Sequence, residues 1–408
     1  MREQERIAAI IQSHFQQEVA FLQRLISAKS SNPFTPDTSR PDVPIEAEVA
    51  SIIYQELQSL GYQAKLVGIS PQRPNVLCHI PGNGSSQKTL ILSTHMDTVE
   101  PDNYTRDPWG AQIEAGRLYG VGAADAKAQI AAFLYAIQAL HQSGIPLAGN
   151  ITLAFVVDEE TGACSPYGTH YLLQQDLLHG DAAIIGEPGD DKIAIGHRGL
   201  YRFRLQVKGE ATHTGLKAWE TGERGRNAIL DVARLVQVLA EQQLPDTPSD
   251  AFPGRRSVLT FPTLIKGGSG INVVPGTCEA YGDVRLLPGL SATQVRTIIQ
   301  KYLRRLDIQE YQLDDLLDIP AVEIQRDVAI VQHLAAAVEI VTGKHLRVEG
   351  SGPACDGWMF IQRGIPTVCG YGVKCGSVHG ADEWTDLKSL NDLTEIYACT
   401  IARFFEYK

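Results

Sequence analysis

The 408-residue sequence has no apolar run long enough to cross a membrane. Its longest unbroken apolar stretch, residues 130–137, is eight residues long, whereas a membrane-spanning helix needs ~20. The first 25 residues carry charges but no continuous apolar segment followed by small residues, as a secretion signal would. We therefore expect a soluble, cytoplasmic protein with no membrane partner.

Positive charge is also scarce. Lys and Arg total 36 against 47 Asp and Glu, which gives a net charge of −11. Nucleic acids and anionic membranes bind to basic faces, so neither is expected as a partner. The apolar fraction of 44% and the charged fraction of 20% are ordinary for a folded protein, and the length predicts about two domains.

Paired cysteines are missing as well. The seven cysteines are scattered and form no Cys-x-x-Cys pair. In a chain of this length they indicate reduced thiols of a cytosolic protein and not a disulfide framework. Cys164 and Cys375 have histidines a few positions away but lack a recognisable nucleophile context, so we interpret both as buried thiols.

Residues 1–197 alternate between helix-like and strand-like segments. Apolar residues at intervals of three and four predict a helix over residues 7–26, and further helices are expected over 46–60 and 126–140. Nearly all-apolar strands are expected at 89–96, 151–158 and 182–187. This alternation predicts an α/β fold with a mostly parallel sheet.

The pattern changes near residue 198. Alternating strands are expected at 200–209, 257–268, 277–288 and 308–320, with helices at 227–242 and 291–306. Two helices on one antiparallel sheet make a separate α+β unit. After about residue 320 the α/β pattern returns. We expect one domain of residues 1–197 and 320–408, interrupted by an inserted domain of residues 198–319.

Acidic and histidine side chains follow the predicted strands of the first domain. His95 and Asp97 end one strand, Glu159 and Glu160 follow the next, and Glu187 follows a third. A further carboxylate, at position 125, precedes a predicted helix. Because α/β sheets bind ligands at the carboxyl ends of their strands, these groups are expected to converge at one edge.

Imidazole and carboxylate groups suit zinc, cobalt or manganese. A shared carboxylate can bridge two such ions, which then hold an attacking water and the substrate oxygen. In His95-x-Asp97 both side chains point the same way on extended backbone, so Asp97 can accept the far N–H of His95. Of the adjacent Glu159 and Glu160, one can bind metal while the other acts as the base.

Each of these signals is weak alone. A histidine near a strand end is more often structural, and Asp125 could merely cap the following helix. Other sites are less well supported: GVGAAD lacks the third glycine of a dinucleotide fingerprint, and GGSG lacks the Lys-Ser/Thr of a phosphate loop. No Gly-x-Ser-x-Gly elbow is present, which argues against a serine hydrolase.

Seven stretches together resemble the acetylornithine deacetylase / succinyl-diaminopimelate desuccinylase family of di-zinc amidohydrolases, which includes carboxypeptidase G and aminoacylases. They span residues 93 to 383 in family order: STHMDTVEP, LYGVGAADAK, VVDEETGA, IIGEP, VKGEATHTG, GGSGINVVPGTCEAYGDVR and GYGVKCGSVHGADE. Val121 and Ala128 depart from the family pattern by replacing an arginine and a glycine. Neither position is a metal ligand.

The resemblance implies a role for each matching residue of the metal site. His95 and Glu187 would bind one zinc, Glu160 and His379 the other, and a bridging aspartate would join them; this residue is Asp125. The base would be Glu159, with Asp97 orienting His95. The resemblance also implies a cis peptide bond after the bridging aspartate.

In the inserted, ferredoxin-like domain, the resemblance implies a lid and a dimer interface. His213 would reach into the partner's active site and stabilise the oxyanion, while Asn272 and Arg285 would hold the substrate. An alternative for Arg285 is a strand residue paired at the surface. Asp356 lies in an atypical setting, and its role stays open.

The expected function is metal-dependent hydrolysis of the amide bond of an N-acyl amino acid with a free carboxylate. The expected cofactors are two divalent ions, zinc first and Co²⁺ or Mn²⁺ as alternatives. A dipeptidase or carboxypeptidase acting on small peptides would share this metal site. A non-catalytic binding protein on the same fold is a minor alternative. The expected assembly is a homodimer through the inserted domain.

Overall fold

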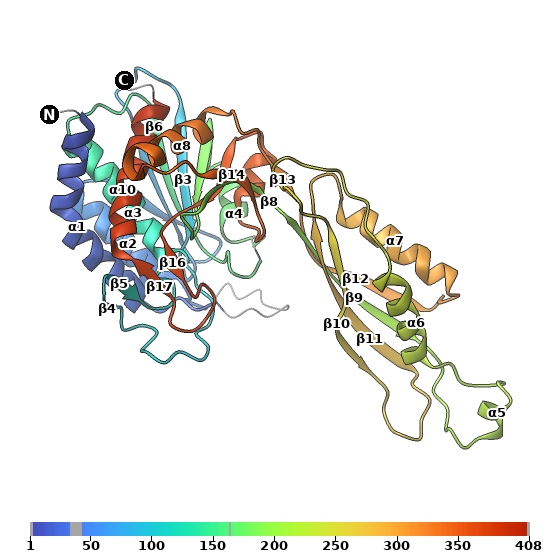
Figure 1. The fold of residues 1–408 in the computed structure, drawn as a ribbon. Coiled ribbons are helices and arrows are strands. Elements are labelled where there is room, and N and C mark those ends of the chain that lie inside the picture. Colours follow the sequence, from blue (N-terminus) through green and yellow to red (C-terminus); the bar gives the residue numbers. More distant parts are fainter. Residues whose placement is uncertain (1–2, 33–42, 163–164, 406–408) are drawn as a thin grey trace. The chain divides into compact units, whose positions relative to one another are not determined.

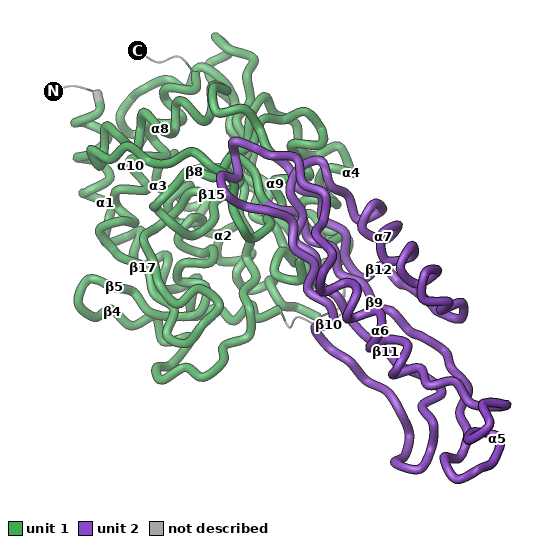
Figure 2. Tube along the Cα trace, turned by 45° about the vertical axis from the view of Figure 1, so that its right-hand side comes forward, with its two compact units in different colours: residues 1–197, 323–408 green, residues 198–322 purple. Residues whose placement is uncertain are grey.

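The computed structural model describes residues 3–32, 43–162 and 165–405. Two compact units make up the chain. Unit 1 consists of residues 1–197 and 323–408, and unit 2 of residues 198–322 (Figure 2). Cys164 lies outside the described residues. The other six cysteines are free thiols, five of them buried, and Cys375 is half-buried where a buried thiol was predicted.

A nine-stranded sheet forms the centre of unit 1 (Figure 1). Its main path runs in the order β1 (Ala64–Val67), β2 (Asn75–Ile80), β6 (Asn150–Val156), β3 (Thr89–His95), β7 (Ala182–Gly186), β15 (Thr367–Tyr371), β8 (Lys192–His197) and β13 (Val322–Glu323). The ninth strand, β14 (Arg347–Ser351), pairs with β8. The four central strands β6, β3, β7 and β15 are parallel, which confirms the predicted α/β fold with a mostly parallel sheet.

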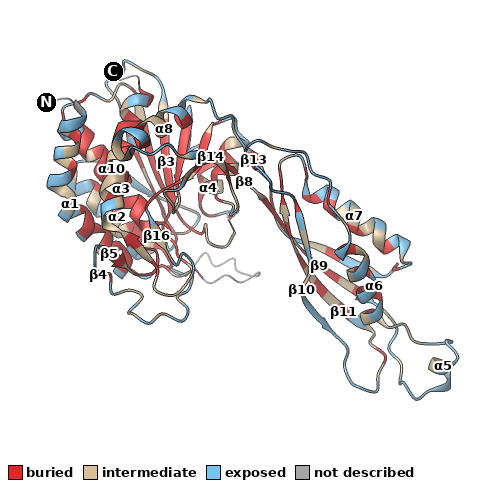
Figure 3. Ribbon diagram, viewed as in Figure 1, coloured by how far each residue is buried: buried red, intermediate tan, exposed pale blue. Residues whose placement is uncertain are grey.

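Helices pack around this sheet, so its central strands are buried along almost their whole length (Figure 3). The helices of unit 1 are α1 (Glu3–Ser27), α2 (Ala47–Ser59), α3 (Lys127–Gln142), α4 (Thr169–Gln174), α8 (Ala329–Thr342), α9 (Gly357–Ile361) and α10 (Leu387–Phe404). Helix α3 contacts α1, α10 and strand β3. This position explains why α3 is apolar on nearly every side.

A small antiparallel sheet joins distant parts of unit 1. It contains β16 (Cys375–Gly376), β17 (Trp384–Asp386), β5 (Arg117–Tyr119) and β4 (Gln112–Glu114), in that order. Trp384 pairs with Tyr119. The loop between β16 and β17, which carries His379, is therefore held beside the segment that leads to Asp125. Strands of two or three residues have no periodicity that a sequence could reveal.

Unit 2 is a four-stranded antiparallel sheet in the order β10 (Val258–Gly267), β11 (Thr277–Leu286), β9 (Gly199–Lys208) and β12 (Tyr311–Ile319). Helices α6 (Ala228–Ala240) and α7 (Ala292–Arg305) share one apolar core with the sheet. Alternate residues of β9 enter that core, as the sequence pattern predicted. The short helix α5 (Lys217–Glu220) has no buried residue.

Candidate metal centre

The predicted ligands of unit 1 meet at the carboxyl edge of its sheet. His95 is the last residue of β3, and Glu187 directly follows β7. Glu160 lies four residues after the end of β6. Since β6, β3 and β7 are parallel neighbours, their carboxyl ends lie at one edge.

Asp125 is the centre of this arrangement. One of its carboxylate oxygens lies 3.0 Å from Nε2 of His95, and the other lies 3.1 Å from Nε2 of His379. The same His379 nitrogen lies 3.2 Å from a carboxylate oxygen of Glu160. The alternative role of Asp125 as a helix cap does not hold, because the N-cap of α3 is Ala126, which has no side-chain cap.

Two groups of possible ligands share Asp125. His95, Asp125 and Glu187 form one, and Asp125, Glu160 and His379 form the other. Within each group the ligand atoms lie within 4.8 Å of one another. A carboxylate with one oxygen directed to each group is the arrangement that a bridge between two ions requires.

Two buried oxygens show that the site suits cations. Oε1 of Glu160 and Oε1 of Glu187 are buried and have no hydrogen-bond partner among the described residues. A buried, unsatisfied carboxylate oxygen is costly unless a cation or donor reaches it. The donor set of imidazoles and carboxylates matches zinc, cobalt and manganese.

The pKa values of the carboxyl groups reflect this crowding. Burial raises the pKa of Glu187 well above its usual range, and the charges of Asp125 and Glu160 raise it further while His95 lowers it. Burial also raises the pKa of Glu159 well above its usual range, again opposed by His95. These shifts are typical of acidic groups gathered to bind cations.

The pKa values of the two histidines are raised as well, because carboxylates surround them. Hydrogen bonds to Asp125 and Glu160 raise the pKa of His379 to about 11. Burial lowers the pKa of His95, but its hydrogen bonds to Asp125 and Asp97 outweigh burial and hold it well above the usual value. Without cations, protonated imidazoles supply the positive charge between the carboxylates.

Asp97 connects the end of β3 to the segment that follows β6. Its backbone carbonyl lies 2.9 Å from Nδ1 of His95, closer than its carboxylate, at 3.5 Å. The two carboxylate oxygens accept the backbone N–H groups of Glu159 and Glu160, at 3.2 and 3.0 Å. Asp97 therefore positions both glutamates as well as the histidine.

Glu383 is a residue of the site that the sequence reasoning missed. Its buried carboxylate accepts backbone N–H groups from Ala124 at 2.7 Å, Asp125 at 3.0 Å and Gly122 at 3.3 Å. It thus holds the turn that presents Asp125. The expected cis peptide bond between Asp125 and Ala126 is present in this turn. A glutamate four residues after His379 carries no signal of that role in a single sequence.

Asp356, whose role the sequence left open, is also buried in unit 1. Burial raises its pKa to about 6, and a hydrogen bond from Oγ1 of Thr169, at 2.5 Å, opposes that shift. Its charge also raises the pKa of Glu159 and of Glu187. Asp356 therefore adds to the acidic character of the site.

The predicted residues of unit 2 form two groups. His213 and Asn272 are exposed neighbours, with 3.2 Å between Nε2 of His213 and the Asn272 amide. Nδ1 of His213 accepts the backbone N–H of Gly215 at 3.0 Å. Arg285 lies near the far end of β11, where it donates to Asp283 at 2.9 Å.

Two other features of unit 1 differ in chemistry from the metal centre. His197, Cys355 and Cys369 lie close together, but the thiols are packed in an apolar cluster and donate to the carbonyls of Cys369 and Thr367.

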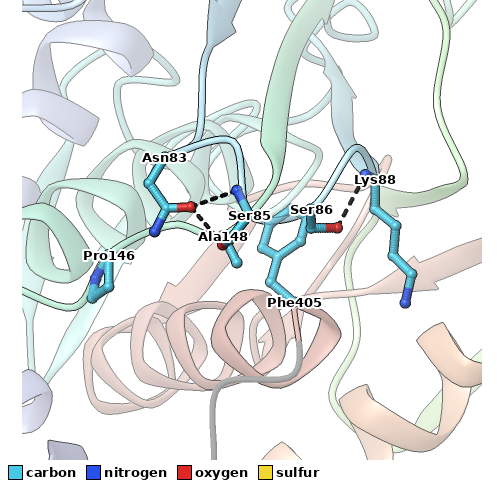
Figure 4. A pocket seen from close by; sticks show the side chains of 7 residues that line it. All are labelled: Asn83, Ser85, Ser86, Lys88, Pro146, Ala148 and Phe405. Atoms are coloured by element: carbon cyan, nitrogen blue, oxygen red, sulfur yellow. Dashed lines mark hydrogen bonds between the residues drawn. The ribbon is translucent and has the colours of Figure 1, made fainter.

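A cavity of about 360 Å³ opens elsewhere in unit 1 (Figure 4). It is lined by Asn83, Ser85, Ser86, Lys88, Pro146, Ala148 and Phe405. Since Lys88 directly precedes β3, this cavity lies at the opposite end of that strand from His95.

Comparison with known proteins gives a consistent result. A model of peptidase family M20/M25/M40 matches residues 91–403. The chain is 28% identical over 379 residues to a succinyl-diaminopimelate desuccinylase of Gluconacetobacter diazotrophicus, covering 88% of this chain and 92% of that one. It is also 28% identical over 369 residues to an acetylornithine deacetylase of Yersinia pseudotuberculosis, covering 86% and 88%.

Among solved structures, an M20 family metallo-carboxypeptidase of Sulfolobus solfataricus superposes with a TM-score of 0.75 at 18% identity. The match covers 96% of this chain and 99% of that one. Similarity at this level of identity concerns the fold. None of the described helices is long and apolar enough to span a membrane.

Proposed function

Because this chain belongs to peptidase family M20/M25/M40, we propose that it hydrolyses the amide bond of an N-acyl amino acid with the help of two divalent metal ions. The products are a carboxylic acid and a free amino acid. The observation that carries this proposal is the Asp125 carboxylate, with one oxygen toward His95 and the other toward His379. The desuccinylase and deacetylase relatives support the substrate class.

The proposed ligands are divided between two ions. His95 and Glu187 hold one, Glu160 and His379 hold the other, and the shared carboxylate is that of Asp125. Zinc suits this set best, with Co²⁺ and Mn²⁺ as alternatives. Two such ions would lower the pKa of the attacking water and polarise the amide carbonyl.

Glu159 is the proposed general base. It accepts the proton of the attacking water and passes it to the nitrogen of the leaving amine, so that the C–N bond breaks without releasing an amide anion. The hydrogen bond from its backbone N–H to Asp97 keeps Glu159 next to the metal ligands. Asp97 also orients His95 through Nδ1.

In unit 2, His213 is the proposed donor to the negative oxygen that develops when water adds to the amide carbon. Its Nδ1 accepts a backbone N–H, so the hydrogen bond that it donates to the substrate comes from Nε2. Asn272 adjoins that nitrogen. Arg285 is the proposed partner of the substrate's free carboxylate, for which its planar guanidinium is suited.

These two groups of unit 2 are too far apart to serve one small substrate from a single chain. Thr277 and Arg285 are eight residues apart on β11, which at about 3.3 Å per residue is roughly 26 Å, and Asn272 lies beyond Thr277. We therefore assign Arg285 to the active site of one subunit, and His213 with Asn272 to that of its partner. The resulting assembly is a homodimer through unit 2.

The outer strand of unit 2 supports a dimer of this kind. Strand β10 is at the edge of the sheet, where backbone groups are available for pairing. Leu264 and Ile265 on this strand are each nearly half exposed. Exposed apolar side chains on an edge strand are typical of an interface between chains.

Mixed dimers test the trans role of His213. Glu159→Gln and His213→Ala chains, each inactive alone, are co-expressed with different tags, and amine release is measured. If His213 acts in trans, half of the randomly paired dimers have one intact site, which restores about a quarter of wild-type activity. No gain over the separate variants would exclude the trans arrangement.

A dipeptidase or carboxypeptidase remains the second candidate, supported by the fold of the Sulfolobus solfataricus enzyme. The test is amine release from N-acetyl-, N-succinyl- and N-carbamoyl-amino acids and from dipeptides, with zinc-loaded and with chelated protein. Metal-dependent release from one acyl class supports the deacylase, and release from dipeptides alone supports the peptidase. If no metal binds and nothing is cleaved, the protein is a non-catalytic binding protein.

The proposed location is the cytoplasm. The described cysteines are unpaired thiols, which suits a reducing compartment. The net charge of −11 is unfavourable for binding nucleic acids or anionic membranes. The proposed partners are a small carboxylate-bearing amide and a second copy of this chain.

A further inference from the structure

A second group of polar side chains lies beside the metal centre in unit 1 and contributes no metal ligand. It consists of Asn32, Glu46, Arg73 and Asp158, each at most 4% exposed. These residues come from four separate parts of the chain. A charged group is rarely buried this deeply unless its partners are arranged around it.

Arg73 is the cation of this group. Its Nε donates to Glu46 at 2.8 Å, its Nη2 donates to the other Glu46 oxygen, and the same Nη2 donates to Asp158 at 3.0 Å. Its guanidinium also lies over the ring of Tyr167, at 5.6 Å. Carboxylate oxygens of Glu46, Asp97 and Asp158 lie within 4.8 Å of one another, and Arg73 supplies the positive charge there.

Asn32 joins this group to the metal centre. Its side-chain amide donates to Asp97 at 2.9 Å and to Asp158 at 2.6 Å. The Asp97 oxygen that accepts from Asn32 also accepts the backbone N–H of Glu160. Asn32 is therefore one hydrogen bond from Asp97 and two from a proposed metal ligand.

The backbone turns sharply at Asp158, directly before the proposed base Glu159. The φ angle of Asp158 is 64°, in the left-handed region that non-glycine residues rarely adopt. Several bonds hold it there: its backbone N–H donates to Glu46 at 3.1 Å, and Ser165 donates to its second carboxylate oxygen. The residues after this turn are Glu159 and Glu160, so the turn sets the direction of both.

We infer that Arg73 and Asn32 are positioning residues for the reaction. Through Asp158 and Asp97 they fix the segment of Glu159 and Glu160 against the strand end that carries His95. The inference rests on the proposed function, because it assigns the held segment to the general base and to a metal ligand. Neither Arg73 nor Asn32 contacts substrate or metal in this account.

The variants are chosen so that the protein still folds. Asn32→Ala removes the link between the two aspartates and leaves every ion pair in place. Arg73→Met alone would leave the buried carboxylates of Glu46 and Asp158 without their cation. It is therefore combined with Glu46→Gln, which removes the charge of Glu46 and keeps a side-chain oxygen that accepts the backbone N–H of Asp158. Thr394→Val is the matched control: it deletes a hydrogen bond to a buried glutamate, Glu18, outside the metal centre.

Two readouts are compared in zinc- and cobalt-loaded protein. The first is kcat and KM on the best amide substrate, and the second is the visible absorption of bound Co²⁺, which reports ligand geometry without turnover. A displacement of the base by about 1 Å costs up to about 100-fold in rate. We expect kcat to fall at least about tenfold in both test variants, with KM within about threefold.

The cobalt spectrum should change in both test variants and stay that of wild type in Thr394→Val. A folded Asn32→Ala and a folded double variant with wild-type kcat and spectrum would overturn the inference. The same holds if Thr394→Val loses as much kcat as they do. If wild type cleaves no amide, the proposed function fails, and the cobalt spectra alone decide whether Arg73 and Asn32 position the ligands.

Discussion

Removal of the Glu383 carboxylate is expected to destabilise the turn that presents Asp125. In Glu383→Ala, three backbone N–H groups, those of Gly122, Ala124 and Asp125, lose their acceptor in a buried position. An unsatisfied buried donor costs about 1–3 kcal/mol. Water entering the vacated space recovers part of that cost, so the expected loss in the free energy of unfolding is about 3–5 kcal/mol.

Glu383→Gln keeps the volume of the side chain and removes only part of its hydrogen bonding, so it separates these two contributions to stability. The amide oxygen can take the place of Oε1, which accepts from both Ala124 and Asp125. Only the longer bond from Gly122, at 3.3 Å, loses its acceptor. The expected cost is therefore about 1–2 kcal/mol, less than half that of the alanine variant.

Urea unfolding of the metal-free proteins at about pH 4.5 measures both costs. Burial raises the pKa of Glu383 to about 8, so at higher pH its ionisation in the unfolded chain would add to the difference between wild type and the variants. The midpoints and slopes give the free energies of unfolding, and the slope shows whether the denatured state has changed. The refuting result is an alanine variant no less stable than the glutamine variant, because the three backbone bonds would then contribute nothing.

Three further predictions follow from the burial and charge of single groups. Glu159→Gln is expected to lower kcat by about 10²- to 10⁴-fold while two ions stay bound, and steady-state kinetics with wild-type-like turnover would reject Glu159 as the base. Zinc at 100 times its dissociation constant should stabilise the protein by about 2.7 kcal/mol per site, and a thermal scan showing no gain would argue against the site. Burial raises the pKa of Glu18 from 4.5 to about 8, so the folded protein binds a proton that the unfolded chain releases in this range, and stability falls as the pH rises from about 4.5 to 8. Glu18→Gln has no ionisable group at this position, so it should be more stable than wild type at pH 9 by on the order of 4 kcal/mol, with little difference at pH 4.5. Equal stability of the two proteins at pH 9 would contradict this.

Much of the fold could be predicted because local pattern and global packing agree. The three- and four-residue spacing over residues 7–26 corresponds to α1, and the apolar run at 89–96 to the buried strand β3. The helix expected at 46–60 is α2, with Gly61 at a positive φ directly after its cap. The small sheet of β16, β17, β5 and β4 was not predicted, because its strands are stabilised by long-range pairing and not by their own periodicity.

Some residues of the candidate site could likewise be predicted from the sequence, and others could not. His95, Glu160 and Glu187 could be proposed because residues after parallel strands meet at one edge. Arg73 and Glu383 could not, because the acceptors of Arg73 lie 27 and 85 residues away and Glu383 accepts from groups about 260 residues away. Their roles depend on burial and on hydrogen bonds that no local spacing encodes.

The most direct test of the two-metal account is the number of ions bound by wild type and by Asp125→Ala at equilibrium. Zinc per chain is measured after dialysis against a fixed concentration of free metal. The account predicts two ions for wild type and at least a tenfold weaker affinity at both sites in the variant, because Asp125 supplies one oxygen to each. One ion in wild type, or two ions bound with unchanged affinity in Asp125→Ala, would contradict it.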